Sequence, residues 1–521
     1  MSYAGALSTV ILLPVLLAIG RGRFEWKVDR LLSGLTTIIL LGGALAALVT
    51  AVLSPTAHRF ILWDVGSIWG MQPDALAFGF LLDRIGLVMV ALVGVVGAAT
   101  TAFAGRYLVG DPGRGRFMVW FAVTVAAAQV LVLSVNLAQL ALVWLVISAG
   151  LHRLLVHHGE RVRAQQAARM KFVISRIGDL ALLMAMAVLL PAAGTLDLVA
   201  LAALAGSPAL AGAAPLAVIG LMIAAMCKSA QFPMHVWLPD TLEAPTPVSA
   251  LMHAGIINAG GFLLIRCSSV MISVPLILDA LLVIGMITAV LGVLAMWAQS
   301  DVKKALAWST VGQMGFMVLQ CGLGAFAAAL IHLIGHAGYK AHAFLRSGSP
   351  SAAMAPPPTA AGGIGAALAV YLIAAAAAVA LVLTLQQDGQ THAGGPLLAL
   401  AIGLALAQVW TAGAGSLAAR TCVVIALALA AVPLLSMVHA WLGLPIAPEP
   451  FARGFSGALI GGVVAVALIG LAIISVLLPW LALRLPALRI HARDGWYCGF
   501  IAERLIRRIL PLPTSTAKAL S

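Results

Sequence analysis

The residues of this 521-residue chain best suited to chemistry are lysines and histidines inside long apolar segments. Lys228 follows an apolar run, and the next acid along the segment, Asp240, comes roughly three helical turns later. Pro233 removes a backbone donor and clashes with the preceding turn, so we expect a helix break close to the buried amine. Broken helices of this kind line ion sites in transporters. We therefore predict that Lys228 exchanges protons; the alternative is a lysine paired with a carboxylate for packing.

A second group of ionisable residues follows helical spacing. His332, His336 and Lys340 recur at i, i+4 and i+8, which places them in one stripe along a helix. A histidine pair at i, i+4 also suits zinc, but no carboxylate nearby in sequence completes a ligand set, so we expect no metal here. We interpret the stripe as a proton path, with an interhelical hydrogen-bond seam as the alternative.

Four further residues qualify as candidates, because ionisable groups are costly in a bilayer and often mark ion pathways. His253 follows the segment that contains Lys228, and its ordinary pKa near 6.5 suits a proton relay rather than simple packing. Asp83 lies beside Arg84 in an otherwise apolar segment, which we expect to be helical. Arg176 and Asp179 are spaced i, i+3, which allows either a self-neutralising ion pair or a part in conduction.

The elements that hold these residues are predicted to be membrane helices. The chain is 62% hydrophobic and only 9% charged, and its mean hydropathy is +1.09. A soluble domain keeps roughly a quarter of its residues charged. Lipid offers no hydrogen bonds to the backbone, so spans must be helices or closed barrels, and the apolar runs here are about 17–25 residues long, as helices require. The predicted fold class is an all-α integral membrane bundle.

We predict about fifteen transmembrane helices. The first apolar stretch is included because it lacks the basic start and the cleavage site of a signal peptide. The helices are expected near 4–20, 31–53, 77–103, 117–134, 136–155, 172–190, 212–236, 248–268, 273–297, 305–322, 324–345, 364–385, 396–411, 421–441 and 457–482. They divide into N-terminal helices (1–110), a translocating core (111–350), C-terminal helices (351–485) and a tail (486–521).

Charge distribution predicts the orientation. The net charge of +13 could indicate nucleic-acid binding, but the basic residues gather in the connections after odd-numbered helices. This is the positive-inside pattern, so the N-terminus is expected outside and the tail in the cytoplasm, with no nucleic-acid partner. The five cysteines lack metal or haem spacing, so we expect no cofactor.

The tail segment 496–510 is amphipathic. One side of the predicted helix carries apolar residues and the other carries charge: Trp496, Phe500, Ile501, Leu505 and Ile509 against Glu503, Arg504, Arg507 and Arg508. Such a helix can lie in the lipid interface with its arginines on phosphates. The alternative is that it helps to seat a soluble partner.

Three segments carry a resemblance to a known superfamily. Residues 228–265 read KSAQFPMHVWLPDTLEAPTPVSALMHAGIINAGGFLLI, which closely resembles the proton-pumping membrane chains of respiratory complex I and Mrp-type antiporters. The segments 301–317 and 332–349 resemble the same chains. The resemblance implies an antiporter-like core, in which the residues matching Lys228, His253 and Lys340 belong to the proton path.

Departures from the pumping chains indicate the branch. Residues 144–155 contain no acid where those chains have a glutamate, and 363–385 contain no lysine. With Trp-x3-Ser-x3-His-Arg-Leu-Leu at 144–155 and a tail HARDGWYCGFIAERL, the chain resembles DabB, the family of membrane subunits of DAB inorganic-carbon accumulation systems. The resemblance implies a bacterial inner-membrane location and a cytoplasmic DabA-like zinc partner similar to β-carbonic anhydrase. It also implies that entry of H⁺ or Na⁺ drives CO2 hydration in that partner, while this chain performs no covalent chemistry.

Two other classes of function are compatible with the sequence. A complex I or Mrp pump subunit would share the same motifs, and a non-conducting scaffold would carry the same spans. Burial of Lys228 and of the histidine–lysine stripe without use argues against a scaffold. A bicarbonate carrier is disfavoured because the spans show no arginine cluster.

Overall fold

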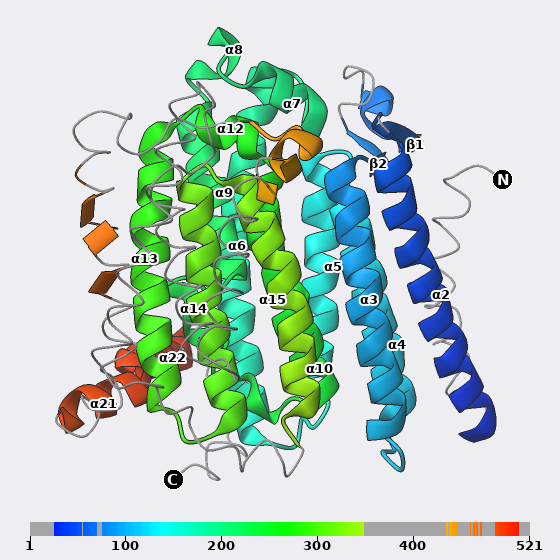
Figure 1. The fold of residues 1–521 in the computed structure, drawn as a ribbon, viewed down its shortest axis with the longest axis vertical. Coiled ribbons are helices and arrows are strands. Elements are labelled where there is room, and N and C mark those ends of the chain that lie inside the picture. Colours follow the sequence, from blue (N-terminus) through cyan, green and yellow to red (C-terminus); the bar gives the residue numbers. More distant parts are fainter. Residues whose placement is uncertain are drawn as a thin grey trace, which may run out of the picture.

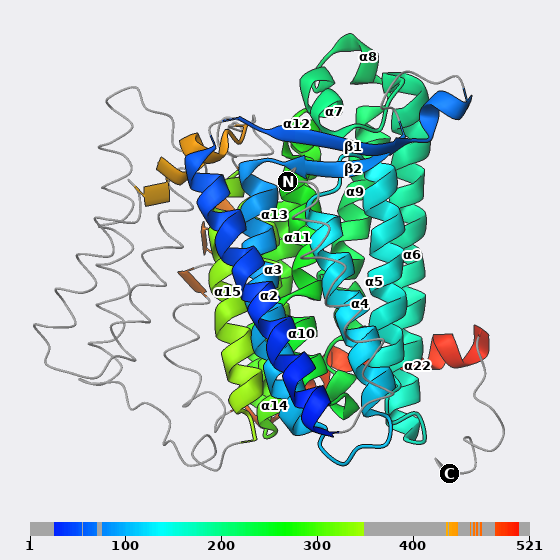
Figure 2. The same ribbon diagram turned by 90° about the vertical axis from the view of Figure 1, so that its right-hand side faces the viewer.

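The computed structural model describes residues 26–54, 56–69, 76–348 and 485–509, with short pieces between 434 and 470. These residues form a bundle of long helices whose axes are roughly aligned with one another (Figures 1 and 2). Within the described residues, seven helical segments are long and apolar enough to cross a membrane. The prediction of a multi-pass helical membrane protein is therefore confirmed, whereas the count of fifteen is not.

Five long helices lie between residues 26 and 193 of the described chain. They are α2 (Trp26–Leu53), α3 (Arg84–Tyr107), α4 (Arg114–Val132), α5 (Leu137–Leu155) and α6 (Val162–Ala193). Figure 2 shows α2, α3, α4, α5 and α6 side by side. The buried faces of α3 and α6 contain many glycine and alanine residues, which lets membrane helices approach closely without a hydrophobic driving force between them.

The prediction of a single helix over 77–103 is wrong at its start. Ala77–Leu82 is strand β2, which pairs antiparallel with β1 (His58–Asp64). The helix begins only at Arg84, and Asp83 is its N-cap, because its carboxylate accepts the Gly86 N–H at 2.8 Å. Asp83 and Arg84 thus lie at a helix end and not inside an apolar span.

The outer edge of β2 is covered by side-chain and backbone groups of the α4–α5 junction. The Gln139 amide accepts the Gly79 N–H at 3.1 Å and donates to the Gly79 carbonyl at 2.9 Å. Leu81 N–H donates to the Leu133 carbonyl at 2.8 Å. Unpaired strand edges carry exposed polar groups, and these contacts satisfy them. The short helices α7 (Leu198–Leu204), α8 (Pro208–Ala211) and α12 (Ser268–Ile272) lie at the same end of the bundle (Figure 1).

Two elements in the middle of the bundle are discontinuous. The predicted helix 212–236 ends much earlier, as α9 (Ala214–Lys228), and only the short turns η3 (Met234–Trp237) and η4 (Thr241–Glu243) follow it. The predicted helix 248–268 consists of α10 (Thr246–Ala254), the turn η5 (Ile256–Asn258) and α11 (Ala259–Arg266). A break near Pro233 was expected, but it begins at Lys228, and the second break was not predicted.

Three helices complete the described core: α13 (Pro275–Ala298), α14 (Val302–Gly322) and α15 (Phe326–Arg346). Near the opposite end of the bundle from the hairpin lie α21 (Pro486–Arg493), η7 (Gly495–Tyr497) and α22 (Cys498–Ile509) (Figure 1). The predicted helices 4–20, 364–385 and 396–411, and most of 421–441 and 457–482, lie outside the described residues.

Candidate functional site

Lys228 is the last residue of α9, and its side chain is buried inside the bundle. Its ammonium nitrogen lies 4.4 Å from the ring centroid of Trp144 on α5, a cation–π contact. An aromatic face stabilises a cation less than a carboxylate does, because the ring carries no net charge. The predicted position of Lys228, buried beside a helix break, is confirmed.

The acidic neighbour of this lysine is provided by α6. Arg176 Nη2 and Asp179 Oδ2 are 2.6 Å apart, so the predicted i, i+3 ion pair exists. Asp179 is buried, and its charge also interacts with the charges of Lys228 on α9 and of Lys171 earlier on α6. Asp179 on α6 is thus a carboxylate whose charge acts on Lys228, whereas residues 144–155 of α5 contain no acid.

Lys171 was not among the predicted site residues. Its buried ammonium donates to the Ser148 backbone carbonyl at 2.6 Å and to Ser148 Oγ at 2.8 Å. Ser148 belongs to the α5 segment that lacks an acid, so a lysine held by neutral oxygens occupies this region of the bundle. A sequence signal did exist, because Lys171 stands in the apolar part of a helix that continues to Arg176 and Asp179. We call Lys171, Arg176, Asp179 and Lys228 the α6–α9 cluster.

The two broken helices contact each other at their breaks. Ser229 Oγ, just beyond the end of α9, donates to the Ile257 carbonyl in η5 at 2.7 Å. Beyond it, Phe232 N–H donates to Thr288 Oγ1 on α13 at 3.0 Å. A Cβ at Gly260 would lie 2.5 Å from the Ala225 carbonyl oxygen, so α11 packs directly on the end of α9 only because that residue is glycine.

His253, on α10, belongs to a second polar group, which it forms with residues of α14 and α15. Its Nδ1 lies 3.1 Å from Thr310 Oγ1 on α14, and its ring stacks on Phe344 with centroids 4.3 Å apart. His336 Nε2 lies 3.2 Å from the His253 carbonyl oxygen and can donate to it. The structure therefore brings His253 together with the predicted stripe on α15.

The stripe itself faces α14. Lys340 is fully buried and donates to the Leu306 carbonyl at 2.9 Å and to Ser309 Oγ. His332 lies between two glutamine amides, with Nδ1 2.9 Å from Gln320 Oε1 and Nε2 2.8 Å from Gln313 Oε1. A neutral imidazole donates from one nitrogen only, so this ring must be doubly protonated or one amide must present its NH2 group.

Polar atoms without a protein partner occur at both breaks. Gln231 Oε1, after α9, and Asn258 Oδ1, in η5, are buried and have no hydrogen bond from the described residues. Buried polar groups inside proteins are normally hydrogen-bonded, often to ordered water. Each break thus contains a buried polar oxygen that ordered water could satisfy.

Asp83 is not part of either group. Its carboxylate forms a bidentate contact with Arg266 at the end of α11, and Arg266 also donates to the Val132 carbonyl at 3.1 Å. Through Arg266, Asp83 thus links the start of α3 to the ends of α4 and α11 at the hairpin end of the bundle. Its predicted place inside an apolar helix is wrong, because Asp83 is the N-cap of α3.

Two models of known protein families match parts of this chain. The model described as “NADH:quinone oxidoreductase/Mrp antiporter, TM” matches residues 134–386, and the one described as “NADH-Ubiquinone oxidoreductase (complex I), chain 5 N-terminus” matches residues 70–118. Residues 70–118 and 134–386 are thus similar to the antiporter-like membrane subunits of complex I and Mrp complexes. The first match contains the whole α6–α9 cluster, His253 and the α15 stripe.

Several relatives of this antiporter-like family are similar in sequence. The “Probable inorganic carbon transporter subunit DabB1” of Halothiobacillus neapolitanus is 37% identical over 325 residues, 61% of this chain and 55% of that protein. The corresponding DabB of Hydrogenovibrio crunogenus is 36% identical over 353 residues, 67% of this chain and 65% of that protein. NAD(P)H-quinone oxidoreductase chain 5 of Synechocystis is 37% identical over 280 residues, 53% of this chain and 41% of that protein. The chain thus spans less than two thirds of the length of these relatives.

Solved structures share the antiporter-like fold. A chain of the Mrp complex from a Dietzia species has a TM-score of 0.57 and 23% identity, with 98% of this chain and 58% of that chain covered. A chain of an archaeal membrane-bound sulfane sulfur reductase also has a TM-score of 0.57, with 17% identity and coverage of 90% and 76%. At these identities the likeness concerns the fold alone.

Proposed function

We propose that this chain is the cation-conducting membrane subunit of an inorganic carbon accumulation complex. The observation that carries the proposal is the buried Lys228, placed at the end of a broken helix and over the ring of Trp144, with the charge of Asp179 on α6 acting on it. A lysine in this position can gain and lose a proton without unfolding its surroundings. The similarity to the inorganic carbon transporter subunits reported above supports the assignment to a carbon accumulation complex.

The proposed path has two polar sections joined at the helix breaks. One section is the α6–α9 cluster, and the other is His253 with the α15 stripe. The Ser229–Ile257 contact and the buried oxygens of Gln231 and Asn258 lie at the junction, where water can complete the connection. H⁺ suits these stations because lysine and histidine nitrogens bind protons. Na⁺ prefers oxygen ligands, of which the Lys228 surroundings offer few.

The proposal includes a partner that uses the cation. We propose that the chain lies in a bacterial inner membrane, with its C-terminus in the cytoplasm, and that a DabA-like zinc protein performs CO2 hydration there. This chain then acts as transport subunit and not as the enzyme. A complex I or Mrp pump subunit is the second candidate, supported by the 37% identity to the Synechocystis chain. Ser148 and Lys171 favour the first candidate, because a neutral contact replaces the acid expected on α5 of a pump.

The decisive experiment changes Lys228. Lys228→Ala should abolish CO2-independent growth of a carbonic-anhydrase-deficient host that carries both subunits, at unchanged membrane insertion. Lys228→Arg should fail as well, because a guanidinium does not deprotonate in proteins. Arg163→Gln, at an exposed position near the start of α6, is the matched control and should support normal growth. Full rescue by either Lys228 variant at normal expression would rule out the proposed role.

The tail helix α22 is the proposed docking element for the partner. Its Phe500, Ile501 and Leu505 side chains are 67%, 56% and 54% exposed, whereas Ile506 packs against the core. Apolar side chains that point away from the core need either lipid or protein to cover them. The helix contacts α6 and η3, which places it next to the α9 break.

Truncation after Leu488 tests this docking role. In detergent, lipid anchoring no longer contributes, so the truncated chain should lose capture of its zinc partner in a pull-down. A double variant, Phe500→Ser with Leu505→Ser, should show the same loss with the tail still present. Arg508→Gln on the charged side is the control. Wild-type capture by the truncated chain would mean that the helix is only a membrane anchor.

A further inference from the structure

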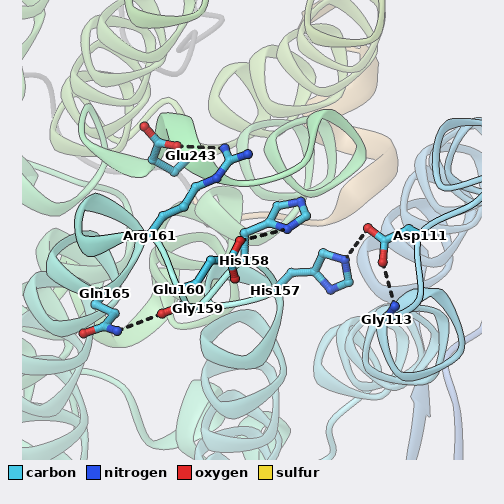
Figure 3. A network of polar contacts seen from close by, with 9 residues as sticks. All are labelled: Asp111, Gly113, His157, His158, Gly159, Glu160, Arg161, Gln165 and Glu243. Atoms are coloured by element: carbon cyan, nitrogen blue, oxygen red, sulfur yellow. Dashed lines mark hydrogen bonds and ion pairs between the residues drawn. The ribbon is translucent and has the colours of Figure 1, made fainter. Parts of the chain in front are cut away.

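A compact group of metal-ligand side chains lies outside the proposed path, where two loops meet. Asp111 comes from the α3–α4 loop, and His157 and His158 come from the α5–α6 loop. One ligand atom from each of the three residues can be chosen such that all lie within 4.8 Å of one another. Figure 3 shows the His157 ring directed at the Asp111 carboxylate, with His158 beside it.

The three side chains are held in place by their surroundings. His157 Nε2 lies 3.0 Å from Asp111 Oδ2, and Gly113 N–H donates to the other carboxylate oxygen at 2.7 Å. The His157 side chain is only 4% exposed, and the edge of its ring meets Phe117 with centroids 5.0 Å apart. A Cβ at Gly113 would lie 2.8 Å from His157 Cε1, so glycine leaves room for the ring.

His158 supplies the movable part of the group. Its side chain is 33% exposed, and its Nδ1 lies 3.6 Å from Glu160 Oε1, which leaves Nε2 free to bind an ion. A carboxylate on the second nitrogen of a metal-bound histidine is a common arrangement that orients the ring. Zinc holds nitrogen and oxygen ligands at about 2.0–2.2 Å, which puts ligand atoms about 3.4 Å apart. The ligand atoms now lie within 4.8 Å of one another, so the partly exposed His158 ring would have to turn to bring them to that distance.

We propose that Asp111, His157 and His158 form a binding site for a divalent transition metal ion of the zinc class. Two imidazoles and one carboxylate match the donor set of such ions, and three protein ligands leave a fourth position for water. The ion would join the α3–α4 loop to the α5–α6 loop. Because one position stays open and one ligand is exposed, the ion can exchange with the surrounding solution.

The same turn reaches the connection that follows the α9 break. Arg161 Nη1 lies 3.0 Å from Glu243 Oε2, and Glu243 ends the η4 turn between α9 and α10 (Figure 3). A metal ion on His157 and His158 fixes the backbone only three residues before Arg161. The site would therefore restrain the segment that separates the two broken helices. This consequence for conduction rests on the proposed function, whereas metal binding itself does not.

The test measures metal binding by the full-length chain, purified in detergent without an affinity tag and stripped with chelator. Equilibrium dialysis against Zn²⁺, and Co²⁺ absorption as a report of tetrahedral coordination, should both give one ion per chain. His158→Gln and Asp111→Asn should each weaken binding at least tenfold; the asparagine retains an oxygen for Gly113 N–H. His491→Gln, an exposed histidine on α21, is the matched control and should bind like wild type.

Two results would overturn the metal site. One is a wild-type chain that binds less than half an equivalent of Zn²⁺ in equilibrium dialysis, at a free Zn²⁺ concentration that saturates small-molecule chelators with similar nitrogen and oxygen donors. The other is a wild-type affinity in both ligand variants, which would place any bound ion elsewhere. Loss of carbon uptake in the Lys228 variants with intact Zn²⁺ binding would separate this site from the proposed ion path.

Discussion

Gly260→Ala should disturb the junction of the two broken helices more than any change in polar chemistry there. The added Cβ would lie 2.4 Å from Ser229 Oγ and 2.5 Å from the Ala225 carbonyl oxygen. Ordinary carbon contacts begin near 3.5 Å, so α11 and the end of α9 must separate by about 1 Å. Overpacking of this size costs about 1–3 kcal/mol in well-packed interiors. Because Lys228 is the last residue of α9, the separation also displaces the lysine from Trp144 and Asp179.

The assay combines thermal unfolding in detergent with carbon uptake at matched membrane levels. The alanine variant should unfold at a lower temperature and should lose most uptake. Gly42→Ala on α2 is the control, because a Cβ there meets no described atom within 4 Å and alanine favours a helix by about 0.5–1 kcal/mol. A Gly260→Ala chain with unchanged melting temperature and uptake would refute the close packing of α11 on α9.

Three further outcomes are expected. Single and double glutamine variants of the α15 stripe should lose uncoupler-sensitive uptake non-additively, since groups that act as a unit do not contribute independently; independent, multiplicative losses would indicate a structural seam. Lys171→Met should reduce uptake at least tenfold, whereas Ser148→Ala should retain most of it because the backbone carbonyl at 2.6 Å remains; equal activity of both would exclude Lys171 from the path. For Asp111, partial burial raises the pKa of the carboxyl, but hydrogen bonds from His157 and Gly113 outweigh it and hold the pKa below its ordinary 3.8. Its stabilising effect is then present above pH 3.8 and lost as pH falls through the lower folded value, so with chelator present the melting-temperature deficit of Asp111→Asn should vanish in acid; a constant deficit would contradict this.

The features that sequence predicted correctly are local. The i, i+4, i+8 spacing places His332, His336 and Lys340 on one helical face whatever the rest of the chain does. The Arg176–Asp179 pair follows from a spacing of three within one helix. Pro233 signalled a break in the segment that carries Lys228. Each of these depends on a few neighbouring residues, and the structure retains them.

The features that were missed depend on contacts between distant segments. Asp83 was placed inside a helix because apolar residues flank it, although an aspartate before a helix is also a common N-cap. Its partner Arg266 lies 183 residues away, and no local pattern connects them. No proline marks the break after α10. Its η5 turn is instead held by Ser229, which donates to the Ile257 carbonyl from 28 residues earlier in the chain. Asp111 and His157 are 46 residues apart, so their group too becomes visible only once the helices are packed.

The covered edge of β2 has a consequence for the order of events during synthesis. Gly79 and the Gln139 amide that completes its hydrogen bonding are 60 residues apart in the chain. At about 5–20 residues per second, a ribosome needs about 3–12 s to extend the chain from one to the other. During that interval one edge of the hairpin lacks its hydrogen-bond partners, and α5 supplies the Gln139 amide when it arrives. Site-specific crosslinking of stalled chains of increasing length would detect the change from an open to a closed hairpin once α5 has inserted.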